Sequence, residues 1–448
     1  MFLCRRISLS VTLLVSVAVI AGVGAPSAMA APTCMPEGTN IQGIGSSLQK
    51  TAQEIWTGRE VPSGTPLTAI PHSPNAFPDS YREKCKAEKN PPTVSYTSTG
   101  SGMGLTAFGY TGGTLDKELA FIASDDGPNA TQIGDAKAAS GVEPVILPVS
   151  QTAIAVIVHL PAGCTLTGGI TWQDLNKVFG GSTIRKWSEF STKHEAAAGD
   201  CEHEITRVVR AEGSGTTFQF KHYLATLEEK LPCETEGHTH WAELEEVGAG
   251  EKPNIVWPEC PTGHTPVVPR EGGGAVAKYV MENPNTIGYA ALPDAKNNGA
   301  ATAKLQNGVV EEVPTYAEPG NTATSNARCA NARYIVPPKG RDEAGNTGLG
   351  VNWSETFGAQ PEVGGTEYPL CTLTYVAGWN EYTEAIYGTN AIAYGELVED
   401  YIANYVVSTE AGQGQKAIEG HWYARLPTGV NKETDVQESA EFIASKLG

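Results

Sequence analysis

The stretch from Arg210 to Phe220 has the sequence RAEGSGTTFQF, and the rest of the chain is best understood from it. The residues before it, Ile205–Val209, are mostly apolar and β-branched, which is typical of a buried strand. Gly213-Ser-Gly215 interrupts this strand, and Thr216–Leu224 has the pattern of the first turns of a helix. The first N–H groups of a helix lack intrahelical partners and carry partial positive charge, so this order of elements predicts an anion site.

Two charged residues strengthen this prediction. Arg210 offers a planar fork of donors at the end of the strand, and Glu212 follows where it can hold that guanidinium. The alternative for this stretch alone is an ordinary strand-to-helix turn with a Ser or Thr N-cap.

Two further segments repeat the order of strand, glycine turn, hydroxyl and helix. From Ile41, a short strand ends in Gly43-Ile-Gly45, and Ser46 and Ser47 open a helix. The strand Val94–Ser98 runs into Thr99-Gly-Ser-Gly-Met-Gly104 and a helix from Leu105. In open α/β sheets, ligands bind beyond the carboxyl ends of strands, so three such turns predict an oxyanion site.

The remaining pattern indicates an α/β protein built from layers of sheet and helix. Excursions at 57–92, 228–264 and 296–368 interrupt it; the first is interpreted as a long surface segment, the second is rich in Glu and His, and the third is interpreted as loops with isolated strands. The other expected strands are 119–124 (which ends in Asp125-Asp126), 145–149, 153–160, 286–291 and 370–376; the other expected helices are 170–178, 275–281, 397–407 and 436–447.

The first 30 residues are expected to be a signal peptide. Arg5 and Arg6 precede an apolar run, and Ala28-Met-Ala30 has the small-x-small cleavage pattern, so the mature chain is expected to begin near Ala31 in a secreted or periplasmic protein. The paired arginines suggest a twin-arginine signal. A membrane anchor is the alternative, and the residues before Cys34 do not fit a lipidated cysteine.

Cysteine usage points to an oxidising compartment. Removal of the signal leaves an even number of cysteines, which in an exported chain indicates disulfides. An alternative is a metal site made from Cys233, His238, His240, Cys260 and His264, but oxidation favours a Cys233–Cys260 bridge with solvated histidines. The simplest pairing is sequential: Cys34 with Cys85, Cys164 with Cys201, Cys233 with Cys260, and Cys329 with Cys371.

The formal net charge of −19 argues against nucleic acid and anionic membranes as partners. Any bound anion must then be held by local donors, because the overall field of the protein repels it.

The chain resembles the phosphate-binding proteins of bacterial ABC importers. The likeness covers most of 41–291, and VVRAEGSGT is its most specific part. It is carried by GIGSSL (43–48), YTSTGSGMG (96–104), IASDD (122–126), VVRAEGSGTTF (208–218), TAIAVIVHLP (152–161), TWQDLNKVFGGSTIRKW (171–187) and NPNTIGYA (283–290).

This resemblance implies a two-lobed type II periplasmic-binding-protein fold, with a mixed sheet flanked by helices in each lobe and the ligand in the cleft between them. Two crossings of the hinge divide the chain into a first lobe of 35–148 plus 289–448 and a second lobe of 149–288.

The resemblance also implies the roles of individual residues. Asp125, rather than Asp126, accepts the proton that phosphate keeps near neutral pH, and Glu212 supports Arg210. Ser47-Leu48 stands where the family usually has Thr-Phe, so the hydroxyl is kept and the aromatic ring is lost. The implied phosphate ligands are Ser47, Leu48, Ser101, Asp125, Arg210, Ser214, Gly215 and Thr216.

The implied partners are inorganic phosphate and a membrane importer permease, and the protein is expected to act as a monomer without metal or cofactor. One alternative is a binder of another oxyanion, such as sulfate, molybdate or phosphonate; Asp125 argues against unprotonated anions. A secreted phosphatase is the other alternative. The chain has no G-x-S-x-G, H-E-x-x-H or P-loop motif. The segments 43–48, 96–104, 122–126 and 208–218, which carry the expected site, contain no histidine to act as a base.

Overall fold

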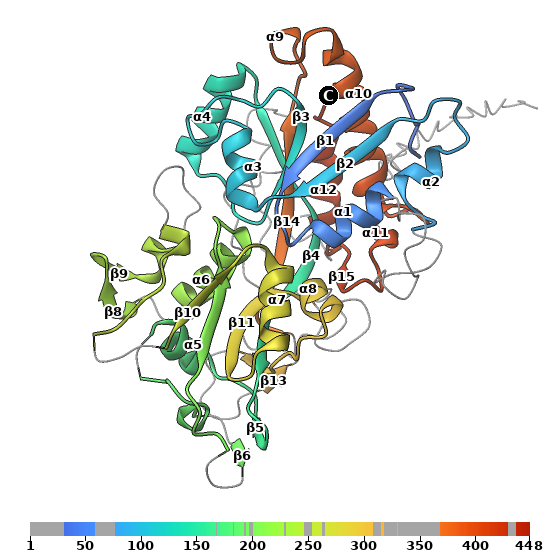
Figure 1. Ribbon diagram of the computed structural model, residues 1–448. Helices are drawn as coiled ribbons and strands as arrows, with labels where there is room; N and C mark the ends of the chain where they lie inside the picture. Colours follow the sequence, from blue (N-terminus) through green and yellow to red (C-terminus); the bar gives the residue numbers. More distant parts are fainter. Residues whose placement is uncertain are drawn as a thin grey trace, which may run out of the picture.

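A continuous mixed sheet forms the centre of the molecule (Figure 1). The computed structural model describes residues 31–58, 77–166, 168–181, 183–191, 194–196, 200–227, 230–245, 253–261, 265–307, 315–317, 329, 368–428 and 436–448. The expected signal peptide lies outside these residues. The nine strands follow the order β10 (Val267–Arg270), β7 (Thr206–Arg210), β11 (Thr286–Ala291), β4 (Pro144–His159), β14 (Cys371–Trp379), β3 (Leu119–Ser124), β1 (Asn40–Gly45) and β2 (Thr93–Ser98), with β15 (Tyr423–Ala424) paired to β4.

The long strand β4 joins two groups of parallel strands. Its first part pairs with β14, which in turn pairs with β3, and its last part pairs with β11. β1 is parallel to β2 and β3, while β7 is parallel to β10 and β11. In Figure 1 the first group lies above and the second below, with β4 and β14 running side by side between them.

The sequence suggested two separate strands, 145–149 and 153–160, where the structure has one. Between the two apolar runs, Gln151 and Thr152 stay extended and buried because their side chains donate to backbone carbonyls. Gln151 Nε2 donates to Arg425 O at 2.6 Å, and Thr152 Oγ1 donates to Trp422 O at 2.8 Å. A polar interruption therefore does not end a strand when a neighbouring segment supplies acceptors.

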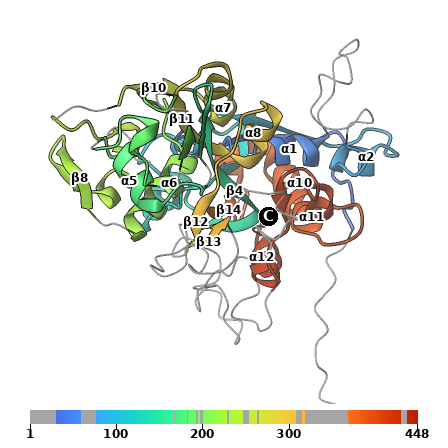
Figure 2. The same ribbon diagram turned by 90° about the horizontal axis from the view of Figure 1, so that it is seen from below.

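Helices cover both faces of the sheet. Figure 2 shows α10, α11 and α12 on one side of the molecule and α5 and α6 on the other. The helices are α1 (Lys50–Thr57), α2 (Tyr81–Cys85), α3 (Ser101–Ala107), α4 (Ala130–Ser140), α5 (Trp172–Phe179), α6 (Gly215–Leu227), α7 (Gly273–Glu282), α8 (Leu292–Asn297), α9 (Glu384–Tyr387), α10 (Ala391–Tyr401), α11 (Gly414–Ala417) and α12 (Val436–Ala444), and a π-helical segment, Ile402–Val406, continues α10.

Most expected elements are present, and α4 shows why one helix was missed. It buries only Ala136, so it lacks the apolar stripe by which amphipathic helices are found. A capping box between Asn129 and Gln132 marks its start instead. Three small antiparallel pairs complete the described structure: β5 (Cys164–Leu166) with β6 (His194–Ala196), β8 (Lys230–Thr235) with β9 (His238–His240), and β12 (Leu305–Asn307) with β13 (Thr315–Ala317).

The four expected disulfides are confirmed, each joining cysteines next to one another along the mature chain. Their loops span 51, 37, 27 and 42 residues. The Cys233–Cys260 bond occupies both thiols of the metal alternative; His264 lies outside the described residues.

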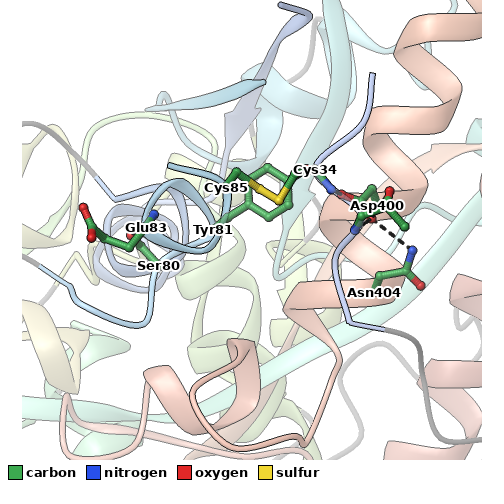
Figure 3. Close-up of a disulfide and its surroundings, with 8 residues drawn as sticks. Cys34, Ser80, Tyr81, Glu83, Cys85, Asp400 and Asn404 are labelled. Atoms are coloured by element: carbon green, nitrogen blue, oxygen red, sulfur yellow. Dashed lines mark hydrogen bonds between the residues drawn. A yellow bond between two sulfur atoms is a disulfide. The ribbon is translucent and has the colours of Figure 1, made fainter. Parts of the chain in front are cut away.

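The Cys34–Cys85 bond joins the start of the described chain to α2, and Asp400 of α10 lies beside it (Figure 3). Asp400 accepts from the backbone N–H groups of Thr33 and Cys34, at 2.6 and 2.9 Å, and from the Tyr81 hydroxyl at 2.7 Å. A buried carboxylate needs such donors to offset its lost hydration.

Two buried cations anchor the described part of the 228–264 excursion. Lys221 Nζ donates to the carbonyl oxygens of Leu244, Asn254 and Val256 at 2.7–2.9 Å and lies 4.4 Å from the centre of the Trp257 ring. Arg207 holds further carbonyls of the same region. Trp56, Trp187 and Trp257 are all buried. None of the described helices has the length and apolar character needed to cross a membrane.

Candidate functional site

Asp125 follows the last residue of β3 and lies fully inside the protein. Its carboxylate accepts from three hydroxyl groups. Ser46 Oγ lies 2.7 and 2.6 Å from the two carboxylate oxygens, Thr374 Oγ1 lies 2.5 Å from Oδ1, and Thr216 Oγ1 lies 3.5 Å from Oδ2. Asp126, the other member of the acidic pair, is also buried, and its backbone is tied to the Ser124 hydroxyl.

The surroundings set the charge state of Asp125. Burial raises the pKa of its carboxyl from 3.8 to about 6, because a charge in a low-dielectric site loses its hydration. The hydrogen bonds from Ser46, Thr374 and Thr216 and the positive charge of Arg210 act in the opposite direction. The carboxylate is therefore charged at neutral pH.

The turn after β1 contributes Ser46, Ser47 and Leu48, but the helix begins later than the sequence suggested. α1 starts at Lys50 because Ser46 Oγ turns inward to Asp125 and accepts from the Leu48 N–H at 3.0 Å. Ser47 Oγ is buried and finds no hydrogen-bond partner among the described residues. Ser46 and Thr374 were not among the expected site residues, because no local pattern marks a contact across 79 or 249 positions.

Ser101 and Gly215 bring the two strand groups into direct contact. Ser101 is the first residue of α3, and its hydroxyl accepts from the Asp125 N–H at 3.2 Å. A Cβ atom at Gly215 would lie 2.5 Å from Ser101 Oγ and 2.8 Å from Asp125 Cβ, so the backbone of α6 approaches as closely as only glycine permits. The Gly102 N–H also donates to Gly213 O at 3.2 Å.

The start of α6 presents free donors to this contact. Ser214 Oγ caps the helix by accepting from the Thr217 N–H at 3.2 Å, and Ser214 N donates to Asn254 Oδ1 at 2.8 Å. The first intrahelical bond runs from Phe218 N to Ser214 O, so the N–H groups of Gly215 and Thr216 precede the first intrahelical acceptor. The helix start predicted from the sequence, with N–H groups that lack intrahelical acceptors, is therefore present.

Arg210 ends β7 with a side chain that is 1% exposed. Its Nε donates to Glu212 Oε1 at 2.8 Å, its Nη2 pairs with the same oxygen, and the Gly272 N–H donates to that oxygen at 2.9 Å. Arg210 Nη1 is buried and has no hydrogen-bond partner within the described part of the chain. A buried unpaired guanidinium donor is costly, so it indicates a ligand position.

A second buried carboxylate lies nearby on α8. Burial raises the pKa of Asp294 to about 6, and the charges of Arg210 and Lys50 oppose this rise. The Cβ position of Gly273, at the start of α7, is 2.2 Å from Asp294 Oδ2, so a side chain at Gly273 has no room. No sequence pattern marks Asp294 as a site residue, because it follows a proline at the start of a short helix.

These groups bring hydroxyls, N–H groups and one arginine together with a single strongly held carboxylate acceptor. Such a set suits an anion that retains a proton, because the donors hold its charge and the carboxylate accepts its proton. The α/β architecture, together with this set of buried donors and one carboxylate acceptor, is typical of a ligand-binding protein.

Comparison with protein families narrows this class. The family model described as PBP superfamily domain matches residues 78–377, and the chain belongs to this superfamily.

Curated relatives carry a consistent name. The protein called "Phosphate-binding protein PstS" of Pasteurella multocida (strain Pm70) is 29% identical over 243 residues, which are 53% of this chain and 60% of the relative. The protein of the same name in Xylella fastidiosa (strain 9a5c) is 30% identical over 247 residues, 54% of this chain and 57% of the relative. The match thus spans less than two thirds of these relatives.

Solved structures share the fold. A phosphate binding protein from Stenotrophomonas maltophilia superposes with a TM-score of 0.55 at 19% identity, covering 90% of this chain and 93% of that one. The structure titled "Crystal structure of DING protein" gives a TM-score of 0.55 at 20% identity and covers 91% and 99% of the two chains. These superpositions show a shared architecture and confirm the expected fold class.

Proposed function

We propose that this protein is an extracytoplasmic binding protein that captures inorganic phosphate and delivers it to a membrane ABC importer. The observation that carries the proposal is the pairing of two buried groups in one site: the unused Arg210 Nη1 donor and the Asp125 carboxylate. The names of the curated relatives support it.

In this proposal each residue expected to contact phosphate has a role that fits its position. Arg210 Nη1 and Ser47 Oγ are buried polar atoms without partners in the described residues, as expected of groups that await a ligand. Gly215 and Thr216 supply N–H groups at the start of α6. Ser101 and Ser214 can each donate a hydroxyl proton, because the contacts that the structure shows use their oxygens as acceptors. The Leu48 N–H donates to Ser46 Oγ, and its role toward the anion stays a prediction.

We propose two lobes that meet at this site, joined by β4 and β14. The first contains β1, β2 and β3, and the second contains β7, β10 and β11. Strand pairing suggests a later boundary than position 289 for the second lobe: Thr302 bridges to Ile157, and Leu305 bridges to Ile170. We therefore assign residues up to about 307 to the second lobe, and the return to the first lobe to β14.

Another oxyanion on the same scaffold is the second candidate. Sulfate and molybdate carry no proton at neutral pH, so the buried carboxylate would repel them, and a site with an unmatched buried charge discriminates strongly. A phosphatase requires a nucleophile with an adjacent base, and no histidine belongs to the described residues that form the site. Reversible binding fits these groups better than catalysis.

Calorimetric titration of the mature protein, stripped of bound anion, tests the proposal. Phosphate, sulfate and a phosphate monoester are titrated in parallel. We expect tight one-to-one binding of phosphate and no heat with sulfate. Binding of sulfate or the monoester with no response to phosphate would show that the cargo is a different anion.

A further inference from the structure

A buried chain of hydrogen bonds leads away from Asp125 into the first strand group. Thr374 Oγ1 donates to Asp125 Oδ1 at 2.5 Å, and Gln49 Nε2 donates to Thr374 Oγ1 at 2.8 Å. Gln53 Nε2 donates to Gln49 Oε1 at 2.9 Å, and the Tyr401 hydroxyl donates to Gln53 Oε1 at 2.9 Å. All five side chains are fully buried.

The direction of this chain is fixed by a backbone carbonyl. Gln49 Nε2 also donates to Tyr375 O at 2.7 Å, and a carbonyl oxygen can only accept. The Gln49 amide therefore has a single orientation, with its NH₂ group toward Thr374. Because the Thr374 oxygen accepts from Gln49, its one hydroxyl proton is left for Asp125.

Ser46 is constrained in the same way from the other side. The Leu48 N–H donates to Ser46 Oγ at 3.0 Å, so the one hydroxyl proton of Ser46 also points to Asp125. Two neighbouring donors thus occupy the carboxylate, and within the described residues neither hydroxyl proton has another acceptor to which it could turn.

We propose that Thr374 and Ser46 are specificity-determining positioning residues, which hold Asp125 as an ionised carboxylate able only to accept, so that the site selects an oxyanion that still carries a proton. The inference rests on the proposed function, since it concerns the same site. A carboxyl group free to protonate would donate instead of accept, and would then lose its preference for a protonated anion.

The other ionisable groups near Asp125 do not all favour its ionised form. Arg210 favours the ionised form of Asp125, whereas Asp125 and Asp294 carry like charges, and the charge of Asp125 raises the pKa of Asp294. The hydroxyls of Tyr96 and Tyr423 donate to the carbonyl oxygens of Ser46 and Leu48, and burial raises the pKa of both well above its usual value, so they stay neutral. Burial itself favours the protonated form of Asp125. The hydroxyl donors Thr374 and Ser46, together with the more distant Thr216, act with Arg210 to favour the charged form.

The test compares three substitutions on β14. Thr374→Val removes the hydroxyl at nearly constant volume, and Thr374→Ser restores it. Thr372→Val is the matched control, because Thr372 is equally buried on the same strand and its hydroxyl donates to Leu373 O rather than to Asp125. Phosphate affinity is measured by calorimetry from pH 5 to pH 9, about two units on each side of neutrality. This range covers the raised pKa expected of a buried carboxyl group.

We expect the affinity of Thr374→Val to fall about tenfold to a hundredfold near pH 7, since a hydrogen bond to a charged group contributes about 1.5–3 kcal/mol. The pH below which binding is lost should rise by about one to two units. Thr374→Ser should return to the wild-type profile, and Thr372→Val should match it throughout. Ser46→Ala should shift the profile in the same direction, which gives a second test if Thr374→Val does not fold.

An equal loss of affinity at every pH would overturn the inference, since it would show a merely structural effect. So would a shifted profile in Thr372→Val. The wild-type titration separates this result from failure of the proposed function: if wild-type protein binds phosphate with a defined pH midpoint that Thr374→Val and Ser46→Ala leave in place, only the inference fails. If wild-type protein does not bind phosphate, both fail.

Discussion

The strand β7 carries two buried arginines, and the surroundings of Arg207 and Arg210 differ in one respect. Arg207 makes four hydrogen bonds, all to backbone carbonyl oxygens, of Phe179, Pro258 and Thr265. Arg210 shares one carboxylate oxygen between two of its nitrogens and leaves Nη1 without a partner in the described residues.

This difference separates a structural cation from a binding cation on the same strand. Arg207 ties the end of α5 to the segment around Pro258, and burial lowers its pKa to about 10 without removing its charge near neutral pH. Arg210 is held by Glu212 on one side only, so its remaining donor is oriented before any ligand arrives. Burial alone would not have distinguished them; the count of satisfied donors does.

Removal of Arg210 should have the largest effect on phosphate binding. Arg210→Ala is expected to weaken affinity about 30-fold to several thousandfold, equivalent to about 2–5 kcal/mol, because the desolvated anion loses its charged partner. Arg210→Lys keeps the charge without the planar fork and should lie between wild type and Arg210→Ala. Calorimetric titration measures all three, and a change below about tenfold for Arg210→Ala contradicts the assigned role.

Removal of Arg207 should reverse the pattern. Arg207→Met leaves the carbonyls of Phe179, Pro258 and Thr265 without their charged donor and should lower the free energy of unfolding by about 3 kcal/mol or more. Phosphate affinity of the folded variant should stay within about threefold of wild type, less than the tenfold that 1.4 kcal/mol represents. Urea unfolding and calorimetry test the two parts separately. Loss of affinity without loss of stability would contradict the comparison.

Asp125 tests the acceptor opposite Arg210. Asp125→Asn should reduce phosphate affinity about tenfold to a hundredfold and relax the preference for phosphate over sulfate, since the amide can donate to an unprotonated anion. Asp126→Asn is the neighbouring control and should keep the wild-type preference. Competition between the two anions measures the ratio. An unchanged ratio in Asp125→Asn would remove Asp125 from the selection of the ligand.

Gly215 tests the close approach of the two strand groups. Gly215→Ala places a methyl group 2.5 Å from Ser101 Oγ and should cost about 1–3 kcal/mol through overpacking, seen as weaker phosphate binding. Gly134→Ala is the matched control, because the added Cβ in α4 meets no atom within 4 Å. Equal affinity in the two variants would show that the contact is not needed for binding.

Local patterns were sufficient to predict most strands, the start of α6 and all four disulfides. The unit from Ile205 to Leu224 could be found because its signals lie next to one another: a β-branched run, a glycine turn and hydroxyls before a helix. The disulfides followed from the even cysteine count and the simplest pairing.

The missed features depend on contacts between distant segments. Ser46 looked like a helix cap, but its hydroxyl bonds to Asp125, so α1 begins at Lys50. Thr374 lies on a buried strand whose sequence carries no sign of a polar role. The roles assigned to the ligands, such as Ser47 and Ser214, came from the resemblance and stay predictions until titrations of variants test them.

The placement of the disulfides has a mechanical consequence. Cys34–Cys85 lies beside the first strand group, and Cys164–Cys201 and Cys233–Cys260 lie beside the second. None of these three disulfides therefore links the two strand groups, which meet at Gly215 and Ser101. In the two-lobe arrangement proposed above, these three disulfides stiffen each lobe without joining one lobe to the other, whereas Cys329–Cys371 lies at the start of β14. Relative rotation of the lobes would then take place in the paired strands β4 and β14, and phosphate could enter and leave while these three bonds stay intact.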